Sequence, residues 1–126
     1  MNVKIDTKEK FTVLTPEEQH ISANMTEELQ NLLLSYTSKD NPHIILNLKN
    51  VKSIDIQAAE TIAVLQQQFY EKSFSFIVCE MQTEVEEIFE KAELLEEMNT
   101  TPTESEAWDI VQMEEIEREF MDGFDE

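Results

Sequence analysis

Two short apolar runs, HIILNL at 43–48 and FSFIVC at 74–79, constrain the fold more than any other feature. Uninterrupted apolar character over so few residues is typical of strands that are buried on both faces of a sheet. Each run is followed by a segment with apolar residues at helical spacing, the first from Ala58 and the second from Val85. Strands that alternate with helices predict an α/β layer fold with a largely parallel sheet.

The segments around these runs complete a predicted order of β-β-α-β-α-β-α, a short strand and a final helix. Residues 1–9 and 10–16 alternate roughly between apolar and polar side chains, which indicates two short strands. Residues 24–36 carry apolar side chains on one helical face. The short strand is expected near 98–101, and the final helix begins just after Pro102.

Three of the predicted helices begin with residues that can satisfy free backbone N–H groups. A capping box pairs a hydroxyl or amide side chain with a glutamate three positions on. The candidate pairs are Asn24 with Glu27, Thr83 with Glu86, and Thr103 with Glu106.

Length and composition predict one soluble domain. The 126 residues, 40% of them hydrophobic, are enough for one packed domain and too few for two. No window approaches 18 uncharged apolar residues, and the first ten residues lack the apolar core of a signal peptide. We therefore expect a cytoplasmic protein that does not insert into a membrane. The lone cysteine, Cys79, lies within an apolar run, which predicts a buried and inert thiol.

The negative charge is concentrated in the second part of the chain. Of the total net charge of −19, residues 80–126 contribute −16, from 18 acidic and 2 basic residues. Such a surface repels phosphate backbones and anionic lipid headgroups, so nucleic-acid binding is not expected. Two interpretations stay open: the charge attracts a protein partner with a basic face, or it only keeps the protein in solution.

The sequence offers no residue set for an enzyme, a metal centre or a cofactor site. Gly123 is the one glycine, whereas phosphate-binding loops and dinucleotide fingerprints need several. His20 and His43 have no partner histidine at metal-ligand spacing, and His43 is expected at the surface or at a sheet edge. No serine lies in a G-x-S-x-G elbow. We therefore predict a non-enzymatic protein that uses no cofactor.

The stretch VKSIDIQAAE at 51–60 joins a predicted strand to a predicted helix. Asp55 stands at this junction, where its carboxylate could cap the helix by accepting from the backbone N–H of Gln57 or Ala58. Such a cap contributes about 1 kcal/mol to stability, which is sufficient reason for an aspartate at this position.

The segment HIILNLKNVKSIDIQAAETIAVL resembles the central part of the STAS family, the domain of sulfate transporters and anti-sigma factor antagonists. In that family a strand ending in LNL or LDL is followed by the pattern v-x-fiDSSGlgvLl. The later segment CEMQTEVEEIFEKAELLEEMNTTPTESEAWDIV resembles the family's last helices and short strand, so the resemblance covers 3–112. It implies one STAS-like domain over 1–112, with a central mixed, largely parallel sheet of four to five strands flanked by about four helices.

The resemblance also bears on phosphorylation at the junction. In the antagonists of this family, a serine in the hydroxyl pair after the aspartate is phosphorylated by a partner kinase that is also the anti-sigma factor. Asp55 matches the aspartate, but Ile56 and Gln57 occupy the hydroxyl positions and Ala58 replaces the glycine. The phosphorylation motif is therefore degenerate. The nearest hydroxyls belong to Ser53 and Thr61.

The family further implies that a protein partner docks on the loop and helix start at this junction. We expect a regulatory protein of bacterial signalling and transcription that binds an anti-sigma factor or a related kinase. The alternative is a small STAS subunit of a larger assembly, such as a lipid-transport ABC complex or a stressosome-like particle. A homodimer also stays open. Ala59 and Ala63 would give a small-residue stripe that a partner can approach closely. The predicted partner-binding residues are Asp55, Ile56, Gln57, Ala58, Ala59, Ile62 and Ala63.

Residues 113–126 lie beyond the resemblance and are treated as a separate acidic tail. Met113, Ile116, Phe120 and Phe124 are spaced 3, 4 and 4, so a continued helix would place them on one face. Two interpretations stay open. The tail is either a frayed, solvated terminus, as its dense charge indicates, or an amphipathic element that lays its apolar side on this molecule, on a second copy or on a partner.

Overall fold

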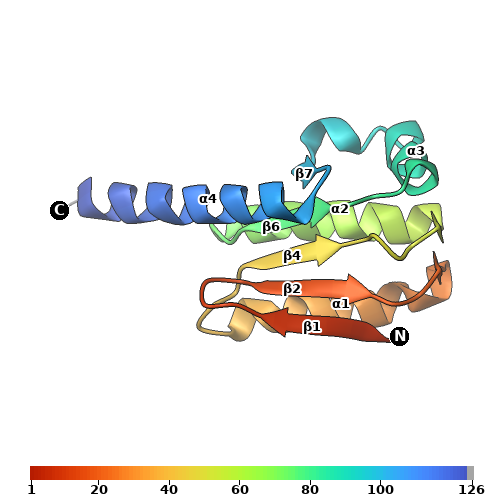
Figure 1. The fold of residues 1–126 in the computed structure, drawn as a ribbon, viewed down its shortest axis with the longest axis horizontal. Helices are drawn as coiled ribbons and strands as arrows, with labels where there is room; N and C mark the ends of the chain where they lie inside the picture. Colours follow the sequence, from red (N-terminus) through yellow and green to blue (C-terminus); the bar gives the residue numbers. More distant parts are fainter. Residues whose placement is uncertain (125–126) are drawn as a thin grey trace.

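A computed structural model describes the backbone of residues 1–124 and the side chains of residues 1–120. The main sheet consists of β1 (Val3–Thr7), β2 (Thr12–Pro16), β4 (Ile44–Asn47), β6 (Phe76–Cys79) and β7 (Thr100–Thr101). Its strand order is β1-β2-β4-β6-β7; β1 is antiparallel to β2, and all other neighbours are parallel (Figure 1). The predicted α/β fold with a mixed, largely parallel sheet is confirmed.

The helices of the described residues cover both faces of this sheet. They are α1 (Thr26–Ser35), α2 (Ile56–Glu71), α3 (Thr83–Lys91) and α4 (Glu104–Phe124), with short 3-10 turns at η1 (Ala23–Met25), η2 (Tyr36–Ser38) and η3 (Leu95–Glu97). In Figure 1, α1 and α2 run side by side behind the sheet, and α4 crosses its other face.

Alternation along the central strands sends their side chains into two separate cores. The larger core lies under α1 and α2 and receives the register partners Leu14, Leu46 and Val78. The smaller core lies under α4 and receives Val13, Ile45 and Ile77, which are register partners in the same strands. The apolar runs recognised in the sequence therefore belong to strands with both faces buried.

Two side chains that the sequence singles out lie in the interior. Cys79 is fully buried, as predicted, and burial raises the pKa of its thiol to about 12. His43 is only 9% exposed, so the expectation of a surface histidine is wrong. Its ring lies inside because Nδ1 accepts a hydrogen bond from the backbone N–H of Ser75 at 3.0 Å. His43 directly precedes β4, and Ser75 directly precedes β6.

A second, two-stranded sheet was not predicted. It consists of β3 (His20–Ile21) and β5 (Ser53–Ile54), which are parallel and pair His20 with Ser53 and Ile21 with Ile54. Strands of two residues are too short to show a periodic pattern in the sequence. This small sheet brings the segment before α1 against the start of α2.

Of the three predicted capping boxes, one has its cap residue at the predicted position. The backbone N–H of Glu106 donates to Thr103 Oγ1 at 3.3 Å, so Thr103 caps α4 as predicted. The Asn24 box is wrong, because η1 leads into α1 and Met25 occupies the cap position without a side-chain bond. The Thr83 box is also wrong, because α3 starts one residue earlier than predicted and Gln82 occupies its cap position.

The helix α4 passes from residue 112 to 113 without a break and continues to Phe124. Figure 1 shows its C-terminal part projecting beyond the sheet. This part of the predicted tail is therefore helical rather than frayed. The predicted side-chain position of Phe124 and residues 125–126 lie outside the described part of the structure.

Candidate functional site

The junction between β5 and α2 is arranged differently from the predicted cap. Asp55 has extended backbone angles, and its carbonyl accepts from the backbone N–H of Ala58 at 3.0 Å. Its carboxylate makes no cap bond to Gln57 or Ala58; it accepts instead from the backbone N–H of Ala23 at 2.8 Å. The predicted side-chain cap is therefore wrong. The small sheet explains the difference, because β3 places Ala23 within reach of Asp55.

His20 joins the same arrangement. Its Nδ1 lies 2.6 Å from Ser53 Oγ, and its Nε2 lies 3.2 Å from the Asp55 carboxylate. The serine, histidine and carboxylate are the groups of a hydrolytic triad, but the His20 and Asp55 side chains are 47% and 41% exposed. Water at such positions screens the pair and weakens any activation of the hydroxyl. We interpret the trio as a link between β3 and the junction.

Sequence reasoning missed this trio because His20 lies more than thirty positions before its partners. No local motif signals the contact, since it depends on the two-residue pairing of β3 with β5.

The predicted partner-binding residues divide into exposed and buried groups. Ile56 is 49% exposed, Gln57 is exposed, and Asp55 and Ala63 are half-buried. The other three are fully buried in the larger core: Ala58, Ala59 and Ile62. The prediction that Ala59 and Ala63 form a stripe open to a partner is therefore wrong, because the helical period turns Ala59 toward the sheet.

The exposed face of α2 is formed by other residues at helical spacing. Val64 is the most exposed large apolar side chain of this helix, at 53%. Glu60 and Gln67 are exposed beside it. The sequence contains a signal for this face, because these positions fall opposite the buried apolar positions on a helix of 3.6 residues per turn. We call this set the α2 face: Ile56, Glu60, Ala63, Val64 and Gln67.

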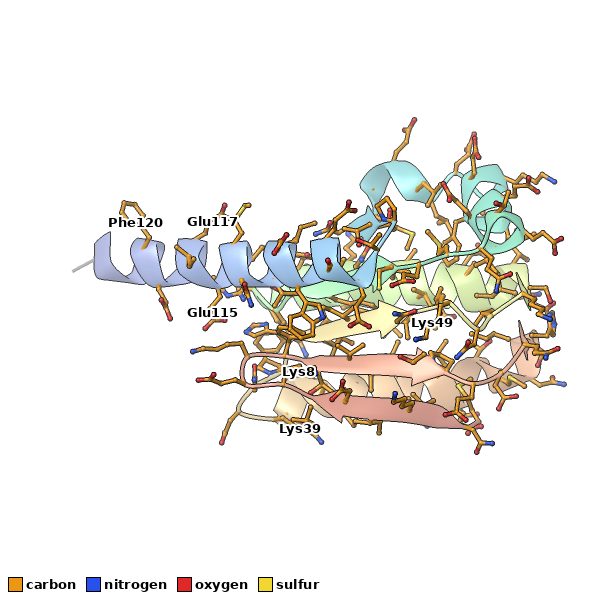
Figure 2. All side chains as sticks on the ribbon, viewed as in Figure 1. Lys8, Lys39, Lys49, Glu115, Glu117 and Phe120 are labelled. Carbon is orange, nitrogen blue, oxygen red and sulfur yellow. The ribbon has the colours of Figure 1, made fainter. Side chains whose placement is uncertain are left out.

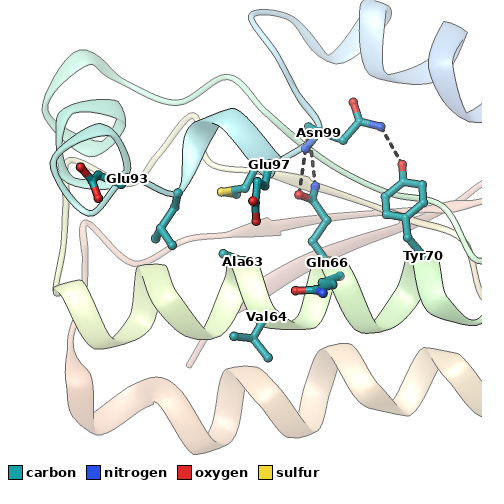
Figure 3. Close-up of a pocket in the computed structure, with 10 residues that line it drawn as sticks. Ala63, Val64, Gln66, Tyr70, Glu93, Glu97 and Asn99 are labelled. Carbon is teal, nitrogen blue, oxygen red and sulfur yellow. Dashed lines mark hydrogen bonds between the residues drawn. The ribbon is translucent and has the colours of Figure 1, made fainter.

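Two depressions flank Val64. One has a volume of about 360 Å³ and separates α2 from the segment around η3 (Figure 3). The other has a volume of about 180 Å³, lies beside α1, and is lined by Val64 together with Gln30 and Gln68. The larger depression is lined by Ala63, Val64, Gln66, Gln67, Tyr70, Glu93, Leu94, Glu97, Met98 and Asn99.

A network of hydrogen bonds holds the residues at the floor of the larger depression in place. The Gln66 amide is 3% exposed, donates to the carbonyls of Phe76 and Asn99, and accepts from the backbone N–H of Asn99. The Asn99 side chain donates to the Tyr70 hydroxyl at 2.6 Å (Figure 3). Burial raises the pKa of Tyr70 well above its ordinary value, so its hydroxyl stays protonated at neutral pH. The rim carries Glu93 and Glu97.

Positions 56 and 57, which follow Asp55, carry no hydroxyl group. Of the nearest hydroxyls, that of Ser53 contacts His20, and that of Thr61 donates to the Gln57 carbonyl at 2.9 Å. Both hydroxyls already have hydrogen-bond partners within the protein.

Comparisons with known proteins agree with the fold described above. The sequence matches the family model of the STAS domain over residues 2–107. Among solved structures, a Thermotoga maritima protein described as an anti-sigma factor antagonist superposes with a TM-score of 0.78 at 18% identity, covering 87% of this chain and 94% of that chain. A STAS domain protein from Planctomyces limnophilus superposes with a TM-score of 0.75 at 16% identity, covering 87% and 97%.

The phosphorylated form of the Bacillus cell fate determinant SpoIIAA is a third similar structure. It superposes with a TM-score of 0.64 at 14% identity, covering 87% of this chain and 99% of that chain. At these identities the structural likeness shows the fold. No curated protein matches the sequence at a significant level. Within the described residues, no helix has both the length and the apolar character required to cross a membrane.

Proposed function

The chain belongs to the STAS domain family, and from that premise we propose that it is a non-enzymatic regulatory domain that binds a protein partner through the α2 face. One observation carries this proposal: Ile56 and Val64 are large apolar side chains that are about half exposed on the same face of one helix. The two side chains lie about two helical turns apart, and a helix face that exposes several large apolar side chains can serve as an interaction site.

The surroundings of Val64 support a protein partner. Depressions on its two sides can receive side chains of a facing surface, and the Gln66 network keeps the larger one in a fixed shape. Preformed pockets of this kind lower the cost of ordering on association. Glu60, Glu93 and Glu97 make the rim acidic, so the proposed partner has basic residues around an apolar centre.

The proposed partner is an anti-sigma factor or a related kinase-like protein in the cytoplasm, by analogy with the family. Ile56 and Gln57 provide no acceptor for a phosphate, so we propose that docking here is not switched by phosphorylation at these positions. A phosphate on a hydroxyl at either position would add about −1.5 to −2 charges at the helix start, and this chain has no hydroxyl there to carry it.

The second candidate function is that of a fixed subunit in a larger assembly, such as a transport complex or a stressosome-like particle. The same absence of a hydroxyl at positions 56 and 57 favours it, because a permanent partner needs no reversible modification.

A photo-crosslinking amino acid at position 64 tests the proposal in cells that express the full chain. Position 5 is the matched control, because Ile5 is 52% exposed and lies on the edge strand β1. We expect one protein to be crosslinked from position 64 and not from position 5. A kinase-like or anti-sigma protein supports the regulatory role, and a transporter or particle subunit supports the assembly role. Equal crosslinking from both positions, or none from position 64, contradicts docking on the α2 face.

A further inference from the structure

The C-terminal half of α4 contacts the rest of the protein through polar side chains. The Glu114 carboxylate accepts from Ser75 Oγ at 2.6 Å and from the Tyr70 hydroxyl at 3.0 Å. Arg118 donates to Ser75 Oγ at 3.1 Å. Glu115 lies 3.5 Å from His43 Nε2 and 3.4 Å from Arg118. We call this set of contacts the polar clasp.

The apolar side chains of the same half of α4 lie on the opposite side of the helix. Met113, Ile116 and Phe120 are 57%, 65% and 64% exposed. Their spacing of 3 and 4 residues forms one stripe along the helix. Figure 2 shows Phe120 on the side of α4 away from the sheet and Glu115 on the side that faces it. We call these three residues the α4 stripe.

The clasp fixes the direction in which the stripe points. A terminal helix would usually turn its apolar side toward the core, because burial of apolar surface is the main stabilising term. Here the polar clasp holds the other side inward, so the α4 stripe is presented to the solvent on a helix that is already formed. A partner would therefore meet a preorganised surface rather than a disordered tail.

Charge selects the kind of partner. The helix α4 carries eight acidic residues and one basic residue, Arg118. A second copy of this chain would bring an equally acidic helix against it, which is unfavourable next to the stripe. The same repulsion acts against anionic membranes. An amphipathic helix with lysine or arginine on both sides of its apolar stripe complements both the apolar side chains and the charge of α4.

We propose that the α4 stripe is a second docking surface, which binds an amphipathic helix of another protein whose apolar side is flanked by basic residues. It is separate from the α2 face, because α2 and α4 cover opposite faces of the main sheet. The chain could then hold two partners at once.

A synthetic helical peptide provides a defined probe. It contains leucines at i, i+3, i+4 and i+7 with lysines between them, and a matched peptide carries glutamates in place of the lysines. Binding to the full chain is measured by calorimetry at physiological salt. Val64→Gln removes the apolar centre of the α2 face, whose proposed partner is also basic, so the comparison is made in the full chain with this substitution. We expect the lysine peptide to bind this chain, a loss of at least about tenfold in affinity when Met113→Gln/Ile116→Gln is added, and no binding of the glutamate peptide.

Ile5→Gln is the matched control, because it also removes an exposed apolar side chain. Added to the Val64→Gln chain, it should leave the binding of the lysine peptide unchanged. Equal binding by all variants would show attraction to the acidic surface in general and would overturn the proposal, as would absence of binding. A wild-type dimer in sedimentation that Ile116→Gln dissociates would assign the stripe to a second copy instead. Binding to zwitterionic vesicles that the same variant abolishes would assign it to a lipid surface.

Discussion

The Asp55 carboxylate accepts a hydrogen bond from the backbone N–H of Ala23 at 2.8 Å, across 32 positions of sequence. This bond, together with the His20 contact, joins the segment before α1 to the start of α2. The start of the α2 face is therefore positioned by a non-local contact and not by a local cap.

The first prediction concerns coupling between Asp55 and His20. Asp55→Ala should lower the free energy of unfolding by about 1 kcal/mol, because it leaves the Ala23 N–H without its acceptor. A double-mutant cycle with His20→Ala, measured by urea denaturation, should give a coupling of about 0.5 kcal/mol. Strictly additive effects would show that the two side chains do not interact in solution.

The second prediction uses two residues with left-handed backbone angles. Ser73 and Glu93 follow the ends of α2 and α3 with φ of 62° and 59°, where glycine is normally preferred. Ser73→Gly and Glu93→Gly should each raise the free energy of unfolding by about 0.5–1 kcal/mol, since relief of the left-handed strain exceeds the entropy that glycine adds to the unfolded chain.

Gln68→Gly is the matched control for these glycine variants, because Gln68 is exposed in the interior of α2. It should lower the free energy of unfolding by about 1 kcal/mol. Destabilisation by all three substitutions would show that the two left-handed positions carry no relievable strain.

The third prediction concerns pH. Burial lowers the pKa of His43 below its ordinary value, and Arg118 lowers it further, while Glu115 acts in the opposite direction. Protonation is therefore harder in the folded chain than in the unfolded chain, so this histidine contributes stability above pH 6.5 that is lost as the pH falls through and below that value.

The variant His43→Asn can retain an acceptor for the Ser75 N–H but does not titrate. Between pH 7.5 and pH 5 it should lose less unfolding free energy than the wild type does, measured by urea denaturation at each pH. The same pH dependence in both proteins would mean that another group causes it.

The sequence was sufficient to predict the central strands of the main sheet. It was not sufficient to predict which residues of α2 are exposed or which groups contact Asp55. The runs at 43–48 and 74–79 determine buried parallel strands, because few other structures bury so many consecutive apolar residues. Ala59 could not be assigned to a face in the same way, since alanine fits both a core and a surface. Val64 was overlooked because an apolar residue is expected inside. The partners of Asp55 were not predictable, since β3 is only two residues long.

The last prediction compares the two sides of α4. Glu114→Ala removes the acceptor of both the Ser75 and the Tyr70 hydroxyls, one of which is partly buried. It should lower the free energy of unfolding by about 1–2 kcal/mol. Ile116→Ala shortens a side chain that is 65% exposed and should change stability by less than about 0.5 kcal/mol. Urea denaturation of both variants, with equal m-values required for the comparison, measures the difference. If the clasp orients α4, the polar substitution is the damaging one, although apolar residues usually contribute more. The reverse order would mean that the α4 stripe is packed within this molecule in solution, and it would remove the basis for a partner on that side.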